Sequence, residues 1–178
     1  QLRENVTYEQ LPTSLVDAFL SVEDSRFFAH NGFDTPRFTK SVIETILHSN
    51  MQGGSTFTMQ LVKLTYFVND ETGKTYTQSI DYKLQQIALS LSLEKKSSKK
   101  DIFTMYVNKM NFGGIGNIRG VQKASLQYFG KKVSELSTSE SALLAGIVNS
   151  PYSYDPHNYL DKATARRDTV LDLMVYHG

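Results

Sequence analysis

Two neighbouring carboxylates followed by aromatic side chains are the first feature of this sequence that could do chemistry. Glu23 and Asp24 end an amphipathic stretch, and Phe27 and His30 follow them. A carboxylate at a helix C-terminus faces the negative end of the helix dipole, and a nearby ring desolvates it. Both effects raise its pKa and suit it to taking a proton from a hydroxyl group. The alternative is a surface acidic pair over a core aromatic residue, with His30 as a hydrogen-bonded structural residue.

A second stretch, residues 53 to 63, combines glycines with hydroxyl, amide and ammonium groups. Two glycines lead into a predicted helix whose first-turn N–H groups form a ready site for an anion such as phosphate. Thr56, Gln60 and Lys63 recur at helical spacing, so they are expected on one face, opposite Phe57 and its apolar neighbours. The alternative is a capped amphipathic helix with a solvated polar face. The spacing of a nucleotide-binding P-loop is absent.

Two further stretches carry weaker signals. Lys83 and Gln86 share a helix face, which again places a cation near an amide. Arg119 follows a glycine-rich segment that permits close backbone approach, and its guanidinium suits bidentate pairing with phosphate or carboxylate. Taken alone, each stretch is more often scaffold than site.

Helical periodicity runs along almost the whole chain, so the sequence predicts a mainly α fold. Capping boxes are expected at Ser14 with Asp17, at Ser98 with Asp101 and at Ser137 with Glu140. Residues 69 to 79 are polar and aperiodic and predict a loop. Predicted helices lie at 14–22, from Thr35-Pro36 through Ile46, from Thr56 through Leu64, from Ile80 through Leu91, at 102–109, through Val121 and Leu126 to Gly130, through Leu143, Leu144 and Ile147, and from about Lys162 toward Tyr176.

The composition limits which classes of protein this chain can belong to. With 178 residues, 40% of them hydrophobic, the chain is expected to form a single domain, residues 1–178, with its own core. A formal net charge of +1 offers no global field for nucleic acid, and the lack of cysteine excludes disulfide and thiolate chemistry. Because the sequence starts at Gln1 without Met or signal peptide, we expect an excised domain whose membrane anchor is missing.

Taken together and in this order, the four stretches resemble family 51 glycosyltransferases, the peptidoglycan-polymerising domains of class A penicillin-binding proteins and monofunctional transglycosylases. The first family motif, Glu-Asp-x-x-Phe-x-x-His-x-Gly, is complete from Glu23 to Gly32. The second, Gly-x-Ser-Thr-x-x-Gln-Gln-x-x-Lys, runs from Gly53 to Lys63, with Met59 replacing the first Gln. The stretches "YVNKMNFGGIGNIRGVQKASLQYFGK" and "ALLAGIVNSPYSYDP" resemble the fourth and fifth motifs. The resemblance implies a lysozyme-like multi-helix domain with a membrane-facing small lobe.

The third family motif, Arg-Lys-x-x-Glu, is where this chain departs. Tyr82 stands in place of the arginine and Gln86 in place of the glutamate, while Lys83 is retained. In relatives that glutamate is thought to orient the donor or to hold a divalent ion beside the pyrophosphate. Gln86 still forms hydrogen bonds but carries no charge. The hypothesis is weaker metal binding and slower turnover, tested with a Gln86→Glu variant.

The resemblance implies an inverting glycosyltransferase that polymerises lipid II into β-1,4 glycan strands and releases polyprenyl pyrophosphate. Glu23 would be the general base for the acceptor hydroxyl. Asp24, Phe27 and His30 would form the acceptor-site scaffold. The substrate pyrophosphate would be bound by Ser55, Thr56, Gln60, Lys63, Lys83, Gln86 and Arg119.

The resemblance also implies the surroundings of the enzyme. A divalent cation, Mg²⁺ or Mn²⁺, would accompany the pyrophosphate, without a side-chain metal site and without an organic cofactor. Phe38, Val42 and Ile46 would line a membrane-side groove for the lipid; the alternative is an ordinary core-facing stripe. The expected partners are lipid II, the lipid-linked glycan strand, the membrane surface and a C-terminal transpeptidase domain in the parent chain. The expected location is the outer face of the bacterial cytoplasmic membrane.

Two other functions remain as alternatives. A lysozyme-like glycan-cleaving enzyme shares the helical architecture, but it usually needs two carboxylates across the scissile bond, and Asp24 is too close in sequence to Glu23. A lipid II-binding domain with reduced activity is suggested by Gln86 and Tyr82.

Overall fold

The computed structural model describes residues 4–36, 38–39, 54–67, 80–114 and 116–178. The chain forms two compact units: one combines residues 1–25 with 107–178, and the other comprises residues 26–106. Within the described ranges the ordered elements are helices, and extended backbone pairs only at an isolated antiparallel bridge, Asn111 with Arg119. The prediction of a mainly α fold is confirmed.

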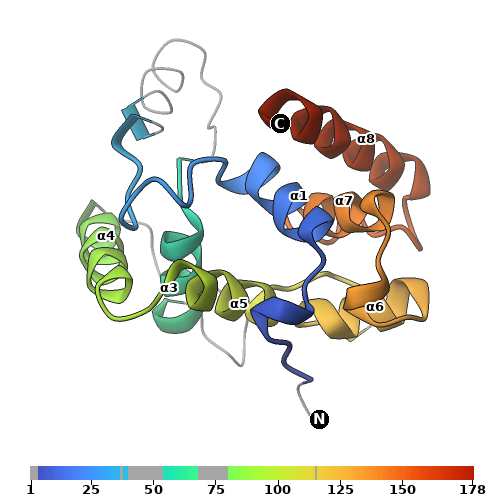
Figure 1. The fold of residues 1–178 in the computed structure, drawn as a ribbon, viewed down its shortest axis with the longest axis horizontal. Helices are drawn as coiled ribbons and strands as arrows, with labels where there is room; N and C mark the ends of the chain where they lie inside the picture. Colours follow the sequence, from blue (N-terminus) through green and yellow to red (C-terminus); the bar gives the residue numbers. More distant parts are fainter. Residues whose placement is uncertain (1–3, 37, 40–53, 68–79, 115) are drawn as a thin grey trace. The chain divides into compact units, whose positions relative to one another are not determined.

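Three helices form the core of the first unit. α1 (Thr13–Glu23), α7 (Thr138–Ile147) and α8 (Leu160–His177) contact one another in every pairing, and Figure 1 shows α7 and α8 beside α1. α1 buries Leu15 and Phe19 completely, as its predicted periodicity requires. The shorter elements of this unit are η1 (Tyr8–Gln10), α6 (Val121–Phe129) and η2 (Val133–Glu135).

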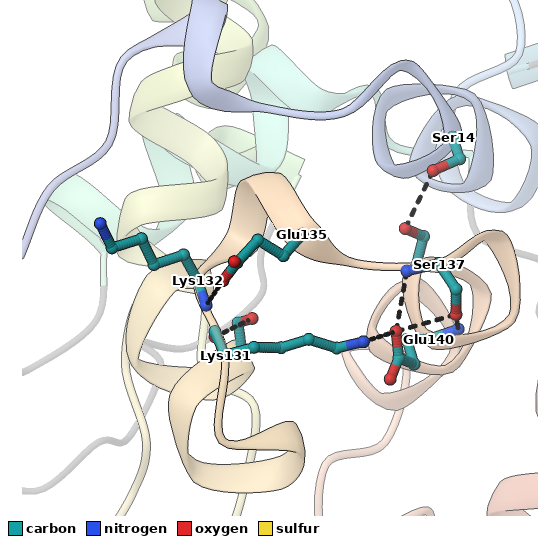
Figure 2. A network of polar contacts seen from close by, with 8 residues as sticks. Ser14, Lys131, Lys132, Glu135, Ser137 and Glu140 are labelled. Atoms are coloured by element: carbon teal, nitrogen blue, oxygen red, sulfur yellow. Dashed lines mark hydrogen bonds and ion pairs between the residues drawn. The ribbon is translucent and has the colours of Figure 1, made fainter.

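Polar side chains fix the start of α7, as the predicted capping box requires. The N–H of Ser137 donates to Glu140 Oε2 at 2.7 Å, and the N–H of Glu140 donates to Ser137 Oγ at 3.4 Å. Lys131 forms an ion pair with the same carboxylate at 2.8 Å (Figure 2). The capping box predicted at Ser14 is wrong, because α1 begins one residue earlier, after Pro12. The hydroxyl of Ser14 instead bonds that of Ser141 at 3.2 Å.

The second unit contains α3 (Phe57–Tyr66), α4 (Ile80–Glu94) and most of α5 (Lys99–Lys109). An aromatic cluster forms its core. The ring of Phe57 lies 5.2 Å from that of Phe27, 5.4 Å from that of Phe103 and 4.6 Å from that of Tyr106. All four side chains are fully buried. The capping box predicted for α5 is confirmed, since Ser98 and Asp101 exchange hydrogen bonds of 3.2 and 3.1 Å.

The helix α4 exists as predicted, but it does not bury the predicted face. Leu84 is 60% exposed and Leu91 41% exposed, although both belong to the expected apolar stripe. The buried positions are Tyr82, Gln86 and Ser90. Gln86 and Ser90 can be buried because each satisfies its polar atoms within the fold: Gln86 bonds α3, and Ser90 Oγ donates to the Gln86 carbonyl at 2.7 Å.

The other predicted boundaries that fall on described residues agree closely with the structure, whereas the helix predicted from Thr35-Pro36 through Ile46 lies mostly outside them. α6 ends at Gly130, whose φ of 69° places it in the left-handed conformation expected of a helix-terminating glycine. α8 begins at Leu160, two residues before the expected start. The predicted loop at 69–79 lies outside the described residues. Among the described helices, none is long and apolar enough to span a membrane.

Candidate active site

A polar cluster between α3 and α4 brings three of the predicted site residues together. The ammonium group of Lys83 donates to Ser55 Oγ at 3.0 Å and to Gln86 Oε1 at 3.2 Å. Ser55 precedes the residue that caps α3, so the Lys83 side chain from α4 reaches the N-terminal end of α3. We call Ser55, Lys63, Lys83 and Gln86 the lysine cluster. It joins two stretches that are separate in the sequence.

Gln86 is the most enclosed member of the lysine cluster, at 2% exposure. Its Nε2 donates to the carbonyl of Met59 on α3 at 2.7 Å, while its Oε1 accepts from Lys83. The amide therefore uses its donor side to tie the two helices together and its accepting side to hold an ammonium group. A carboxylate at this position would have no proton to donate when ionised.

The lysine cluster is electropositive. Burial lowers the pKa of the Lys83 ammonium group, and the charge of Lys63 lowers it further. Lys63 lies in the last turn of α3 and is half-buried. Two ammonium groups near each other favour an anion, because an anion relieves their mutual repulsion as well as their desolvation.

Two other residues predicted on the same face are engaged elsewhere in the unit. Thr56 is fully buried: it caps α3 by accepting from the Met59 N–H at 3.2 Å, and its hydroxyl donates to the carbonyl of Gly32 at 2.8 Å. Gln60 Oε1 accepts from the Tyr106 hydroxyl at 3.1 Å. We infer that Thr56 positions α3 and the loop before it. Thr56, Gln60 and Lys63 therefore do not share one face of α3, as their spacing predicted, because Thr56 is the N-cap of the helix and not one of its helical residues.

Besides Gln86, two other departures from the family motifs occupy core positions. Met59 is fully buried, and its carbonyl receives the Gln86 amide. Tyr82 is buried with its ring 4.6 Å from that of Phe67, so an aromatic pair stands where the motif has a cation. Neither contact was foreseeable from spacing, because each joins segments distant in the sequence.

The loop carrying the end of the first motif packs around the aromatic core. Phe27 is buried, with Lys99 Nζ 4.3 Å above its ring. His30 is buried and its Nδ1 accepts from the Gly32 N–H at 3.1 Å, which matches the structural interpretation of this histidine. Gly32 has φ of 90°, and an added Cβ would lie 2.9 Å from both the Ser90 carbonyl oxygen and Glu94 Cγ.

The acidic pair belongs to the first unit. Glu23 is the last residue of α1 and is half-buried, as predicted for a carboxylate at a helix C-terminus. Asp24 is fully buried and caps α1, and its N–H donates to the Leu20 carbonyl at 3.0 Å. The interpretation of the two residues as a surface acidic pair is therefore wrong for Asp24, whereas Glu23 remains partly exposed.

Arg119 also belongs to the first unit, in a tight hairpin. It pairs with Asn111 across the isolated bridge and is half-buried. Glycines 113, 114 and 116 have positive φ, and Asn117 has φ of 53°, so the turn depends on residues that tolerate the left-handed region. The Tyr128 hydroxyl donates to the Phe112 carbonyl at 2.7 Å and ties the hairpin to α6.

The predicted lipid-groove residues are described only in part. Phe38 is helical and half-buried, and its ring lies 5.2 Å from that of Phe33. Val42 and Ile46 lie outside the described residues. A separate cavity of about 280 Å³ opens on the other side of α3 from Gln60 and Lys63. It is lined by Leu61, Val62, Thr65, Tyr66, Leu89, Ser92, Leu93, Lys96 and Met105.

The side chains around Gln86 do not fit a divalent cation. Mg²⁺ and Mn²⁺ prefer carboxylate and carbonyl oxygens, whereas the one side-chain oxygen of Gln86 already accepts from an ammonium group. Glu94, at the end of α4, is paired with Lys99 at 2.8 Å. Among the described residues no group of three or more His, Cys, Asp or Glu side chains gathers as metal ligands do.

Comparison with known families decides the classification. A family model described as Transglycosylase matches residues 1–175 of the chain. The chain belongs to the transglycosylase family. The match covers the second unit and all but the last three residues of the first, so the acidic pair and the lysine cluster both lie within it.

Curated relatives of this transglycosylase chain carry penicillin-binding names. Penicillin-binding protein 1A of Streptococcus pneumoniae is 40% identical over 176 residues, which are 99% of this chain and 24% of that protein. Penicillin-binding protein 1F of Bacillus subtilis is 37% identical over 177 residues, again 99% of this chain and 24% of that protein. The chain therefore spans about a quarter of the length of these relatives.

Proposed function

We propose that this transglycosylase chain is a peptidoglycan glycosyltransferase that polymerises lipid II. The observation that carries the proposal is the lysine cluster, in which Lys83 reaches the N-terminal end of α3, in a chain of this family. Lipid II offers a sugar whose leaving group is a diphosphate, and two neighbouring ammonium groups suit that leaving group better than a neutral pocket does. The family motif from Glu23 to Gly32 supplies a carboxylate at the end of α1 for the acceptor hydroxyl.

The proposed step is a single displacement with inversion. Glu23 takes the proton of the acceptor 4-hydroxyl while that oxygen attacks the anomeric carbon of the lipid-linked donor strand. The bond from this carbon to the diphosphate oxygen breaks, and the electron pair leaves with polyprenyl diphosphate. The α-linked donor becomes a β-1,4 product. The proton on Glu23 then passes to solvent.

The leaving group determines which side chains are needed. A diphosphate is a stable anion, so its departure requires cations more than a general acid. Lys63 and Lys83 supply positive charge that no carboxylate of the lysine cluster neutralises. Ser55 fixes the Lys83 ammonium group beside the end of α3, where backbone N–H groups add to the positive field.

The proposal places the chain at the outer face of the cytoplasmic membrane, because the lipid carrier of its substrate is embedded there. Its partners would be lipid II, the lipid-linked strand and the membrane surface. The family resemblance also implies a transpeptidase domain in the parent chain, and the chain spans about a quarter of the length of these relatives.

Incubation with fluorescent lipid II tests the proposal. The expected product is a ladder of glycan strands on a gel, which lysozyme then digests. Incubation with finished peptidoglycan is the matched control, and no muropeptides should appear. Release of muropeptides without strand growth would replace the proposal with a glycan-cleaving activity.

A lipid II-binding domain without turnover is the second candidate, and Gln86 in place of the family glutamate favours it. It predicts retention of lipid II in a binding assay without any strand growth. The two candidates separate in the same gel.

A further inference from the structure

The third family motif is changed in this chain where the resemblance implies a divalent cation. Gln86 replaces the glutamate, and its amide is committed on both sides: Nε2 donates to the Met59 carbonyl at 2.7 Å, and Oε1 accepts from Lys83 at 3.2 Å. The side chain is 2% exposed. It therefore offers neither a negative charge nor an uncommitted oxygen to a metal ion.

The charges around Gln86 oppose a second cation. The Lys83 ammonium group is hydrogen-bonded to the amide, and Lys63 is near enough for its charge to act on Lys83. Two described carboxylates of the same unit are engaged away from the cluster: Glu94 with Lys99 at 2.8 Å, and Asp101 with Ser98 at 2.6 Å. Asp81, in the first turn of α4, is exposed. A divalent ion placed here would face two ammonium groups, and Gln86 brings no negative charge to offset them.

The charges that oppose a metal ion at this position favour a diphosphate. Gln86 holds Lys83 in place without neutralising it, and Ser55 holds the same ammonium group from α3. Because these two hydrogen-bond partners of Lys83 are uncharged, they leave its positive charge available to an anion. A glutamate at this position would pair with Lys83 and remove most of that charge, and the metal ion would then be needed to restore it.

We infer that this chain binds the diphosphate of its substrate directly through Lys63 and Lys83, without a divalent cation, and that Gln86 is the positioning residue that makes this possible. The inference rests on the proposed function, since it names how the leaving group is held. It also assigns a consequence to the motif change: Gln86 replaces a metal-dependent arrangement with a metal-independent one.

Inorganic pyrophosphate is the probe for the first test. Its binding to the whole chain is measured by calorimetry in buffer treated with EDTA. The expected dissociation constant is unchanged to within about twofold when the chelator is replaced by dilute Mg²⁺, after correction for the magnesium–pyrophosphate complex. Mn²⁺ alone, followed by electron paramagnetic resonance, should show no bound ion. Pyrophosphate binding that requires added metal would overturn the inference.

A pair of variants tests Gln86 itself. Gln86→Glu should weaken metal-free pyrophosphate binding by about tenfold and should recover it when Mn²⁺ is added. Gln85→Glu is the matched control, because it makes the same change on the exposed side of α4 and should alter neither. A merely structural role for Gln86 would lower binding without any recovery by Mn²⁺, and that result counts against the inference.

Lys83→Met is the second variant, for the case that Gln86→Glu does not fold. It should lower metal-free pyrophosphate affinity by at least about tenfold, and circular dichroism checks that the helices remain. Unchanged affinity would contradict the inference.

Strand growth separates this inference from the proposed function. Growth from lipid II in EDTA supports both, and growth only with metal refutes the inference while leaving the proposed function intact. Metal-free pyrophosphate binding without strand growth under any condition supports the anion site and rejects the glycosyltransferase.

Discussion

Gln86 donates through Nε2 and accepts through Oε1, whereas an ionised carboxylate can only accept. This difference gives the side chain a role in stability as well as in charge. The bond to the Met59 carbonyl joins α4 to α3 at a site where water has no access. A group that fails to donate there leaves a buried carbonyl facing a buried oxygen.

The stability of Gln86→Glu follows from that contact. The substitution should lower the free energy of unfolding by about 1–3 kcal/mol, because a buried hydrogen bond is lost and two oxygens are brought together. Gln85→Glu should change it by less than about 0.5 kcal/mol, since its side chain is exposed. Urea denaturation at neutral pH measures both. Equal stability of the two variants would show that the bond to Met59 carries no net energy.

The lowered pKa of Lys83 predicts that pyrophosphate affinity depends on pH. Burial lowers its pKa below the ordinary lysine value of 10.5, and Lys63 lowers it further. Its positive charge is therefore fully present only below this lowered pKa and is lost as the pH rises through it. Pyrophosphate affinity should decline in alkaline solution before an ordinary lysine would lose its proton. Calorimetry across that range measures the decline.

Lys63→Met provides the control for this pH dependence. Removing the neighbouring charge should raise the pKa of Lys83 and move the decline to higher pH, although overall affinity is lower. A decline at the same pH in both proteins would mean that Lys63 does not act on Lys83.

The side-chain types of the lysine cluster were predictable, but their contacts were not. Ser55, Lys83 and Gln86 were candidates from their spacing and from the family motifs. The contact between Lys83 and Ser55 spans 28 positions in the sequence. The partner of Gln86 is a backbone carbonyl, which carries no signal in the residue type. Tertiary packing decided both.

At the scale of elements, the sequence predicted helices better than it predicted their buried faces. The boxes at Ser98 and Ser137 follow from local chemistry, and both formed. The box at Ser14 failed because Pro12 starts α1 earlier. The prediction that the apolar stripe of α4 is its buried face was wrong. A hydrophobic pattern does not reveal that Gln86 and Ser90 can be buried because their polar groups are hydrogen-bonded. Hydrogen-bond partners decided which face of α4 is covered.

Gly32 links the first-motif loop to α4, and its replacement tests that link. Gly32→Ala adds a Cβ 2.9 Å from the Ser90 carbonyl oxygen, in a backbone with φ of 90°. We expect a loss of about 1–2 kcal/mol from the left-handed conformation and about 1–3 kcal/mol more from overpacking. Thermal denaturation followed by circular dichroism measures the total.

Gly130→Ala is the matched control for Gly32→Ala. It has φ of 69°, but nothing lies within 4 Å of the added Cβ. It should therefore show only the conformational part of the loss. Equal losses in the two variants would mean that the loop moves away from α4 without cost.

In the molecule as a whole, the residues with predicted catalytic and binding roles are distributed over the two units. Glu23 and Arg119 belong to the first unit, and the lysine cluster belongs to the second. The family match covers both. Composition and periodicity could predict a helical fold, but not this division, because the first unit combines the two ends of the chain around a central segment. Contacts between segments so far apart in the chain leave no pattern in the local sequence.

Glu23→Gln tests whether the two units carry separate steps. The variant keeps the shape of the side chain but removes the base, so strand growth from lipid II should fall by about 10²–10⁴-fold. Pyrophosphate affinity should stay unchanged, because the proposed role of Glu23 is at the acceptor hydroxyl and not at the diphosphate. Glu4→Gln, at an exposed position of the same unit as Glu23, should leave both measurements unchanged. Retained strand growth in Glu23→Gln would remove this carboxylate from the mechanism. A parallel loss of pyrophosphate binding would instead mean that Glu23 supports the anion site, and the assignment of base and leaving-group stabilisation to different units would be wrong.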